Sequence, residues 1–231
     1  MNFKSADAKQ WLRMGPRAMF GQFMINIAKK NKKLMVLSAD LGRSSGLARF
    51  KIEFPKQYIS VGISEQNLVG VAAGLADEGF KVFVTSFAPF LSMRASEQIR
   101  MNLGYMKHNV NLVALGSGLS MGFLGNSHFG LEDIAIMRSI PNMSIIAPCD
   151  ADEMKRLMMQ TKDYQGPIYI RLGKGFDPIV SEESLECKIG KNILIAEGTD
   201  ILFVTTGITL KLAIQARENL KESNINAGIM H

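Results

Sequence analysis

Residues 58–86 read YISVGISEQNLVGVAAGLADEGFKVFVTS, and this stretch decides the fold. It begins with a short apolar run, continues with a segment of helical period rich in small side chains, and ends with a second apolar run. The pattern predicts a strand at 58–61, a helix at 65–77 and a strand at 81–86. Two strands joined by a helix form the unit from which parallel sheets are built.

The same alternation extends over most of the 231 residues. Short apolar runs rich in Val and Ile are typical of buried strands, and helical periods separate them. Four more strands are expected, at 34–38, 110–115, 143–147 and 168–171. Helices are expected at 17–30, 90–105, 131–140 and 152–162. The sequence therefore predicts an α/β fold, a doubly wound and mostly parallel sheet with helices on both faces.

The alternation stops at 173–191, where Gly, Pro and acidic residues are typical of a linker. It then resumes with a strand at 201–205, a helix at 210–220 and a strand at 225–230. We expect a first domain at 1–175, a linker at 176–191 and the beginning of a second α/β domain at 192–231. About forty residues are too few for a doubly wound domain, so this segment either packs on the first domain or belongs to a longer one.

Composition excludes several classes of protein. Cys149 and Cys187 have no CxxC spacing, and the three histidines have no metal-ligand spacing, so we expect neither a disulfide scaffold nor a metal site. The net charge is +6, but basic residues are spread along the chain, which indicates no nucleic-acid partner. The N-terminus lacks a secretory signal and no apolar stretch approaches the roughly 20 residues of a membrane span. We expect a cytoplasmic protein without a membrane partner.

Three segments that follow predicted strands carry residues capable of chemistry. Glu65 begins a helix, where Ser64 would cap the first turn and the carboxylate would only complement the helix dipole. Phe87 and Phe90 share one face of a helical turn, either as core packing or as a platform for a flat heterocycle. Residues 116–118 (GSG) are similar to a dinucleotide-binding turn. The next helical pattern starts near residue 131, too late to present its N-terminus to a pyrophosphate.

Taken together, these segments resemble the pyrimidine-binding domain of the thiamine-diphosphate-dependent transketolase family. The resemblance spans residues 17–172 in the order of the family, and residues 192–231 resemble the opening of its C-terminal domain. The matching stretches are 38–41 (SADL), 62–67 (GISEQN), 87–90 (FAPF), 94–100 (RASEQIR) and 127–142, which ends in RSIPN.

The resemblance implies a role for each matching residue. Glu65 would be the catalytic acid that hydrogen-bonds N1′ of the cofactor's aminopyrimidine and so promotes the cofactor carbanion. Its burial would favour the neutral, donating form of the carboxyl. Phe90 would stack on the aminopyrimidine, and Phe87 would line the same pocket. The remaining implied cofactor contacts are Asp40, Ile63 and Arg94. The implied substrate contacts are Ser44, His128, Arg171 and Lys174.

Three departures from the family pattern concern the sugar. The family's Gly-Glu-Asp-Gly-Pro is GFLGN at 122–126, so the Asp that contacts the donor sugar is Leu124. A family His corresponds to Gly116. A phosphate-contacting Arg corresponds to Lys174, which carries a compact charge in place of a bidentate fork. The cofactor contacts are retained, whereas the sugar contacts are altered.

The motif with which the family holds Mg²⁺ and the diphosphate, Gly-Asp-Gly followed by Asn, does not occur in the 231 residues. The resemblance therefore implies the C-terminal subunit of a split transketolase, acting on sugar phosphates. Its partner would be an N-terminal subunit that holds most of the Mg²⁺ contacts, in a homodimer or heterotetramer. The alternatives are a subunit similar to 1-deoxyxylulose-5-phosphate synthase or to the β subunit of 2-oxoacid dehydrogenases, and a non-catalytic scaffold.

Overall fold

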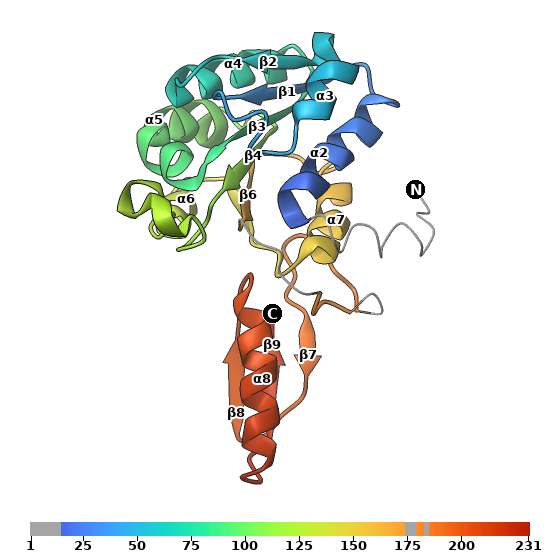
Figure 1. Cartoon of the computed structure of the whole chain (residues 1–231), viewed down its shortest axis with the longest axis vertical. Helices are drawn as coiled ribbons and strands as arrows, with labels where there is room; N and C mark the ends of the chain where they lie inside the picture. Colours follow the sequence, from blue (N-terminus) through green and yellow to red (C-terminus); the bar gives the residue numbers. More distant parts are fainter. Residues whose placement is uncertain (1–14, 174–178, 183–184) are drawn as a thin grey trace.

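The computed structural model describes residues 15–173, 179–182 and 185–231 (Figure 1). Its larger sheet has six parallel strands in the order β2-β1-β3-β4-β6-β5. The strands are β1 (Leu34–Ser38), β2 (Tyr58–Ser60), β3 (Lys81–Phe87), β4 (Val110–Leu115), β5 (Ser144–Ile146) and β6 (Ile168–Leu172). The predicted doubly wound α/β fold is confirmed.

Helices cover both faces of this sheet, and each face has its own apolar core. Helices α2 (Gly15–Ala28), α3 (Ala48–Glu53) and α7 (Ala151–Gln160) lie on one face. The other face carries α4 (Glu65–Asp77), α5 (Ser96–Gln98) and α6 (Asp133–Arg138). Because successive strand residues point to opposite faces, Phe83 belongs to the first core and Val84 to the second.

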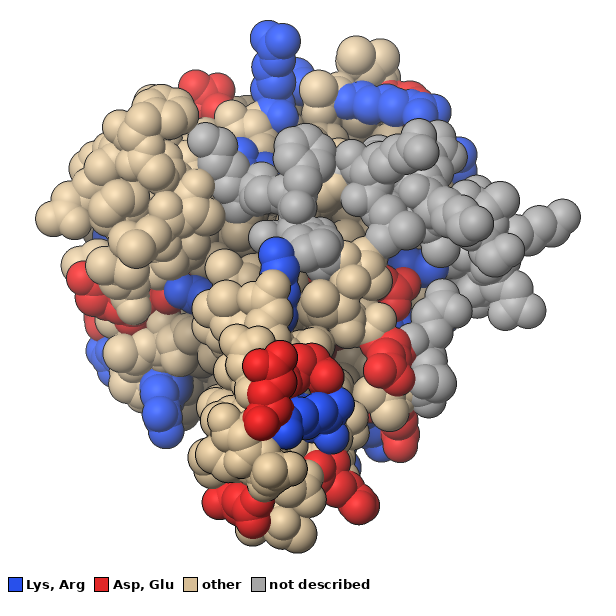
Figure 2. All heavy atoms as spheres, turned by 60° about the horizontal axis from the view of Figure 1, so that its bottom comes forward, with Lys and Arg blue, Asp and Glu red and all other residues tan. Residues whose placement is uncertain are grey.

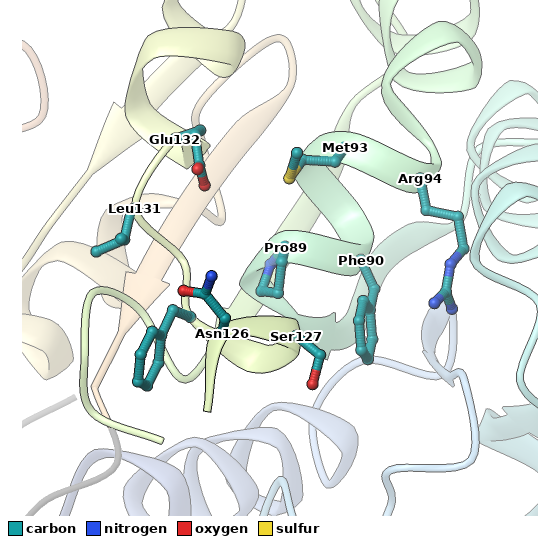
Figure 3. Close-up of a pocket in the computed structure, with 9 residues that line it drawn as sticks. Pro89, Phe90, Met93, Arg94, Asn126, Ser127, Leu131 and Glu132 are labelled. Carbon is teal, nitrogen blue, oxygen red and sulfur yellow. The ribbon is translucent and has the colours of Figure 1, made fainter. Parts of the chain in front are cut away.

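The prediction of one regular α-helix at 90–105 is wrong. Phe90–Arg94 and Ile99–Tyr105 are π-helical, and the single α-turn α5 lies between them. Ala95, at φ −106°, separates the first π segment from α5. An extra residue per turn changes which side chains share a face, and such bulges often occur at functional sites. The first π segment presents Phe90, Met93 and Arg94 beside the loop that contains Asn126 (Figure 3).

Helix α3, strand β7 (Leu194–Ala196) and the 3-10 turns Pro55–Gln57, Gly122–Leu124 and Asn126–His128 were not expected, and the boundaries of the other predicted strands and α-helices agree within two residues. Helix α3 has only six residues and buries only Phe50, so no apolar period marks it. Strand β7 has three residues and gains its order from pairing with a distant strand. The described residues of the predicted linker contain no helix or strand. Among the helices that the structure describes, none has the length and apolar character needed to cross a bilayer.

A smaller sheet follows, with the strand order β7-β9-β8. Strand β9 (Ala227–Met230) pairs parallel with β8 (Ile201–Val204) and antiparallel with β7. Helix α8 (Thr209–Lys221) packs on it through Leu210 and Ala213. The expected strand–helix–strand unit is therefore present. The side that faces the viewer in Figure 2 shows Lys and Arg side chains interspersed with Asp and Glu.

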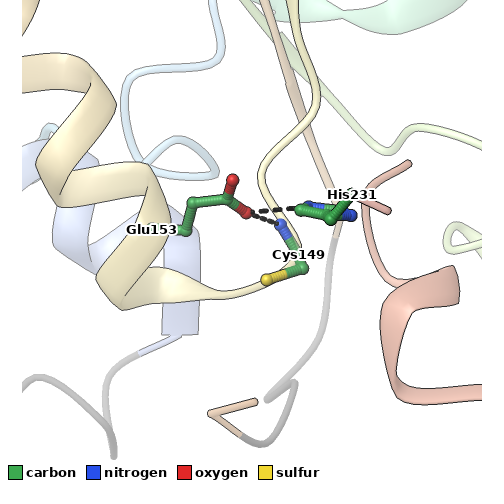
Figure 4. Close-up of side chains that lie close together, drawn as sticks. All are labelled: Cys149, Glu153 and His231. Atoms are coloured by element: carbon green, nitrogen blue, oxygen red, sulfur yellow. Dashed lines mark hydrogen bonds and ion pairs between the residues drawn. The ribbon is translucent and has the colours of Figure 1, made fainter. Parts of the chain in front are cut away.

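A buried cluster connects the end of β9 to the start of α7 (Figure 4). Glu153 Oε2 lies 3.1 Å from Nε2 of His231 and accepts a 2.6 Å hydrogen bond from the backbone N–H of Cys149. Burial raises the pKa of the Cys149 thiol, so its sulfur is a hydrogen-bonding thiol and not a thiolate. Among the described residues, these three side chains form the one group close enough to ligate a metal. Their hydrogen bonds make the cluster a structural link between the two sheets.

The Glu153 link predicts a pH-dependent contribution to stability. Burial raises the pKa of the Glu153 carboxyl, but hydrogen bonds from His231 and from the Cys149 backbone lower it more, so it lies below 4.5. A depressed pKa in the folded state stabilises the fold above pH 4.5, and the contribution is lost as the pH falls through the folded value. Glu153→Gln should therefore cost about 1–3 kcal/mol near neutral pH in denaturant titrations, and less below pH 4. Exposed Glu186→Gln is the control, and equal stability of the two variants at pH 7 would contradict the link.

Candidate active site

The candidate site lies at the carboxyl edge of the larger sheet, where parallel strands all release their loops. The chain leaves β1 toward β2 on one side and returns to β3 on the other, so the loops after β1 and β3 diverge there. The predicted Glu65 and His128 follow β2 and β4, and the predicted Phe87 and Arg171 lie in the last two residues of β3 and β6. The parallel topology is what brings these distant parts of the sequence to one edge.

Glu65 is the first residue of α4, and its side chain is 1% exposed. Its Oε1 accepts a 2.8 Å hydrogen bond from the Ser86 hydroxyl at the end of β3. Its Oε2 accepts a 2.7 Å hydrogen bond from Nη1 of Arg94. Ser64 makes no side-chain cap on α4, because its hydroxyl donates to the Val61 carbonyl. The helix-cap interpretation is therefore wrong for Ser64, and Glu65 is directed to β3 and the π segment.

Three rings meet beside this carboxylate. The ring centroids of Phe87 and Phe90 are 5.8 Å apart, and His128 lies 5.3 Å from the first and 5.2 Å from the second, all edge to face. Phe87 packs partly against the core, whereas Phe90 belongs to neither large core. The Arg94 guanidinium lies over the Phe90 ring, with Cζ 4.2 Å from the centroid. Core packing therefore explains in part why the Phe87 ring lies where it does, but it does not explain the position of the Phe90 ring.

The loop that carries His128 is held in place by a buried ion pair. Gly118 and Gly130 exchange backbone hydrogen bonds of 2.7 and 3.0 Å. Arg171 donates from Nη2 to the Gly130 carbonyl and from Nε to Asp133, at 3.0 and 2.8 Å. The Tyr169 hydroxyl donates to the same Asp133 oxygen. Arg171 therefore positions the loop in this chain. Asp133 was missed because an acid in the first turn of a helix usually indicates only dipole complementarity.

A pocket of about 500 Å³ opens between the first π segment and this loop (Figure 3). Phe90, Met93 and Arg94 line one side. Asn126, Ser127, Phe129, Leu131 and Glu132 line the other side. Apolar walls with a few polar groups are typical of small-molecule sites. Of the predicted residues, Phe90 and Arg94 line this pocket, and Glu65 and His128 contact those two.

The other predicted residues lie outside the Glu65 cluster, which consists of Glu65, Ser86, Phe87, Phe90, Arg94 and His128. Asp40 follows β1 at φ 58°, a conformation uncommon for a residue other than Gly and often found at functional sites. Asp40 and Ser44 are exposed, and Ile63 is among the most exposed apolar residues. No hydrogen bond joins these three to Glu65 among the described residues. Lys174 lies outside the described residues.

Arg17 is a candidate that the sequence analysis missed. From α2, its Nη1 reaches the Ser44 carbonyl at 3.5 Å and its Nη2 reaches Met121 sulfur at 3.4 Å. Its Nε is buried without a partner among the described residues, and burial lowers the pKa of the guanidinium. A half-buried cation with an unused donor is suited to an anionic group. No local pattern distinguishes Arg17 from any surface arginine, because only the fold brings Ser44 and Met121 to it.

The family model described as the transketolase pyrimidine-binding domain matches residues 14–176. A protein of Methanocaldococcus jannaschii named as a transketolase C-terminal section is 42% identical over 218 residues, which cover 94% of this chain and 69% of that protein. One of the subunits of the apulose-4-phosphate transketolase of Phocaeicola vulgatus is 36% identical over 215 residues, covering 93% and 69%. A solved structure described as a split gene transketolase, inactive beta4 tetramer, has a TM-score of 0.83 at 35% identity, covering 94% and 70%.

The family match spans the whole larger sheet and every described residue of the Glu65 cluster. The two relatives share more than a third of their matched residues with this chain over nearly its full length. The chain therefore belongs to the transketolase family and carries that family's pyrimidine-binding domain.

Proposed function

We propose that this chain is the C-terminal subunit of a split, thiamine-diphosphate-dependent transketolase, a transferase that moves a two-carbon ketol unit between sugar phosphates. The observation that carries the proposal is that the buried carboxylate of Glu65 and the ring of Phe90 face one place, where the planar Arg94 guanidinium contacts both. The relatives from Methanocaldococcus jannaschii and Phocaeicola vulgatus are each named as one part of a divided transketolase. A shared fold alone does not establish function, so the proposal rests on this site.

The residues present fit the aminopyrimidine half of the cofactor. Phe90 already carries a planar, nitrogen-bearing group at stacking distance, the Arg94 guanidinium, and that group also bonds Glu65. The site therefore accommodates a flat heterocycle whose nitrogen faces the carboxyl. Thiamine diphosphate, when bound, supplies the nucleophile that attacks the ketose carbonyl.

Each residue of the cluster has a distinct task. Glu65 holds a proton at N1′ of the aminopyrimidine, and Ser86 fixes the carboxyl by its bond to Oε1. Phe87 and His128 enclose the Phe90 ring and exclude water from the carboxyl. The Nδ1 of His128 lies 2.9 Å from the Ser127 hydroxyl, and this contact restrains the imidazole ring. Together, these residues would bind and orient the aminopyrimidine and protonate its N1′.

A partner chain is proposed to hold the diphosphate and most contacts to Mg²⁺, since this chain lacks the Gly-Asp-Gly motif. Exposed apolar side chains occur on the first π segment and on the connections beside the site, and they would form the contact surface: Ile63, Met93, Leu119, Phe123 and Leu131. The solved split transketolase of similar fold is an inactive tetramer of its beta chain. That description supports a requirement for the other subunit.

The sugar contacts differ from the family pattern for a structural reason at Gly116. Its φ is +72°, and a Cβ there would lie 2.6 Å from the Met121 side chain. Any larger residue would strain the backbone and displace Met121, so this loop conformation excludes the family's His. The proposed substrate class is therefore a sugar phosphate bound with fewer imidazole contacts, and its anionic group is assigned to Arg17 near Ser44.

The isolated chain should bind thiamine diphosphate weakly or not at all, even with Mg²⁺. Half of the site cannot compensate for desolvation of the diphosphate. Calorimetry on the purified chain, alone and with its partner subunit, measures this directly. Submicromolar affinity without the partner would contradict the divided site.

Helix α4 should mediate self-association. A Cβ on Gly70 or Gly74 would meet nothing within 4 Å, so no contact within the described chain explains these glycines. Each costs about 1 kcal/mol in a helix interior, which a close crossing with another backbone would offset. Sedimentation should show a dimer for the wild type and a monomer for Gly70→Leu. Gln215→Leu, which places the same side chain at an exposed position of helix α8, is the control. A wild-type chain that remains monomeric would contradict the prediction.

Glu65→Gln should lower kcat of the two-subunit enzyme by at least about 100-fold, because an amide cannot exchange a proton with N1′. Proton exchange at thiazolium C2, followed by NMR, should slow in parallel. Leu124→Asp is the matched control: it restores a family sugar contact, so it should change sugar preference and leave C2 exchange unchanged. If Glu65→Gln exchanges the C2 proton as fast as the wild type, that result would favour the scaffold hypothesis.

A further inference from the structure

Arg94 makes two contacts at once. Its Nη1 donates to Glu65 Oε2 at 2.7 Å, and its Cζ lies 4.2 Å above the centroid of the Phe90 ring. The two partners lie on different elements, Glu65 on α4 and Phe90 on the first π segment. A guanidinium is planar and carries N–H donors at its rim, so it can stack on a ring and bond a carboxylate together.

These are the two contacts that the proposed function assigns to the aminopyrimidine. A flat ring that bonds Glu65 and stacks on Phe90 must lie between them, where the guanidinium lies. Two planar groups cannot occupy that place together, because protein interiors are close-packed. Either Arg94 leaves or the aminopyrimidine makes only one of its contacts.

We propose that Arg94 is a placeholder: it occupies the aminopyrimidine position until the cofactor binds, and cofactor binding displaces it. The proposal rests on the proposed function and adds a competition within the site. The Arg94 side chain is 46% exposed whereas Glu65 is 1% exposed, so the guanidinium can move outward and the carboxylate cannot. The adjoining pocket, about 500 Å³ and lined by Arg94 itself, offers the space.

The placeholder also explains how a buried acid is kept stable before the cofactor binds. A buried carboxylate without a partner is costly, so Glu65 needs a cation whenever the cofactor does not bond it. Arg94 supplies that cation at Oε2, and Ser86 holds Oε1 independently. When Arg94 leaves, the Ser86 bond keeps the carboxyl oriented and Oε2 becomes free for N1′. Arg94 therefore pairs with the Glu65 carboxylate before the cofactor binds, whereas Ser86 orients it both before and after.

The test uses calorimetric titration of thiamine diphosphate, with Mg²⁺, into the complex of this chain with its partner subunit. Arg94→Met keeps the apolar stem and removes the competing guanidinium, so affinity should rise about threefold to tenfold, the range expected for loss of a partly exposed ion pair. Arg94→Lys keeps the charge without the planar stack and should lie between Arg94→Met and wild type. Arg100→Met is the matched control, since among the described residues Arg100 pairs with exposed Glu97 on the adjoining turn α5, and the affinity of this variant should equal wild type.

A double-mutant cycle identifies the interaction responsible. In a Glu65→Gln background the effect of Arg94→Met should shrink, because the ion pair that it removes is already absent. Unchanged or weaker binding in Arg94→Met overturns the placeholder, and weaker binding would mean that Arg94 contacts the bound cofactor. If Arg94→Met does not assemble, Arg94→Gln provides a second neutral side chain with the same expectations.

Failure of this inference is distinguishable from failure of the proposed function. If the wild-type complex binds the cofactor and Glu65→Gln slows C2 exchange, the function stands whatever Arg94→Met shows. If the wild-type complex does not bind thiamine diphosphate at all, both the function and the placeholder are wrong.

Discussion

The buried carboxylate of Glu65 is the constraint on which the site depends. A carboxyl group at 1% exposure requires hydrogen-bond donors that the fold holds in place, and here they are Ser86 and Arg94. One donor comes from the end of β3 and the other from a π-helical segment. Strand β2, helix α4, strand β3 and the π segment must therefore meet at one point. A shift of any of them leaves a buried charge unpaired, which disfavours alternative arrangements.

A second buried carboxylate fixes the opposite wall. Asp133 is also 1% exposed, and Tyr169 and Arg171 from β6 both donate to it. Arg171 in turn holds the Gly130 carbonyl, so the loop from β4 folds back and places His128 against Phe87 and Phe90. The two acids act alike, since each ties a loop or helix start to the carboxyl edge of a strand. Parallel pairing is what aligns those edges.

The proposed site contains one half of the contacts that thiamine diphosphate would need. The aromatic rings and the acid belong to the pyrimidine-binding domain of the transketolase family, to which the chain belongs. Loops with exposed apolar side chains lie at the same edge, so the surface proposed for the partner and the residues proposed for the cofactor lie together. Gly116 has a left-handed conformation against Met121, so the backbone limits which side chains this edge can carry at that position.

Local sequence patterns by themselves determined the strands, the long helices and the position of Glu65 after a strand. Hydrophobic periods and helix-start signals depend only on residues that are close together in the sequence. The rings of Phe87 and Phe90 were visible for the same reason. Only the tertiary structure decided that Arg94 contacts Glu65, that Arg171 holds Asp133, and that Arg17 lies beside Ser44 and Met121. It also decided that 90–105 would break into π segments and that β7 would form. The arginine contacts and the pairing of β7 join residues 27 to 104 positions apart, and a charge or a short strand acquires its role from the partner that the fold places beside it.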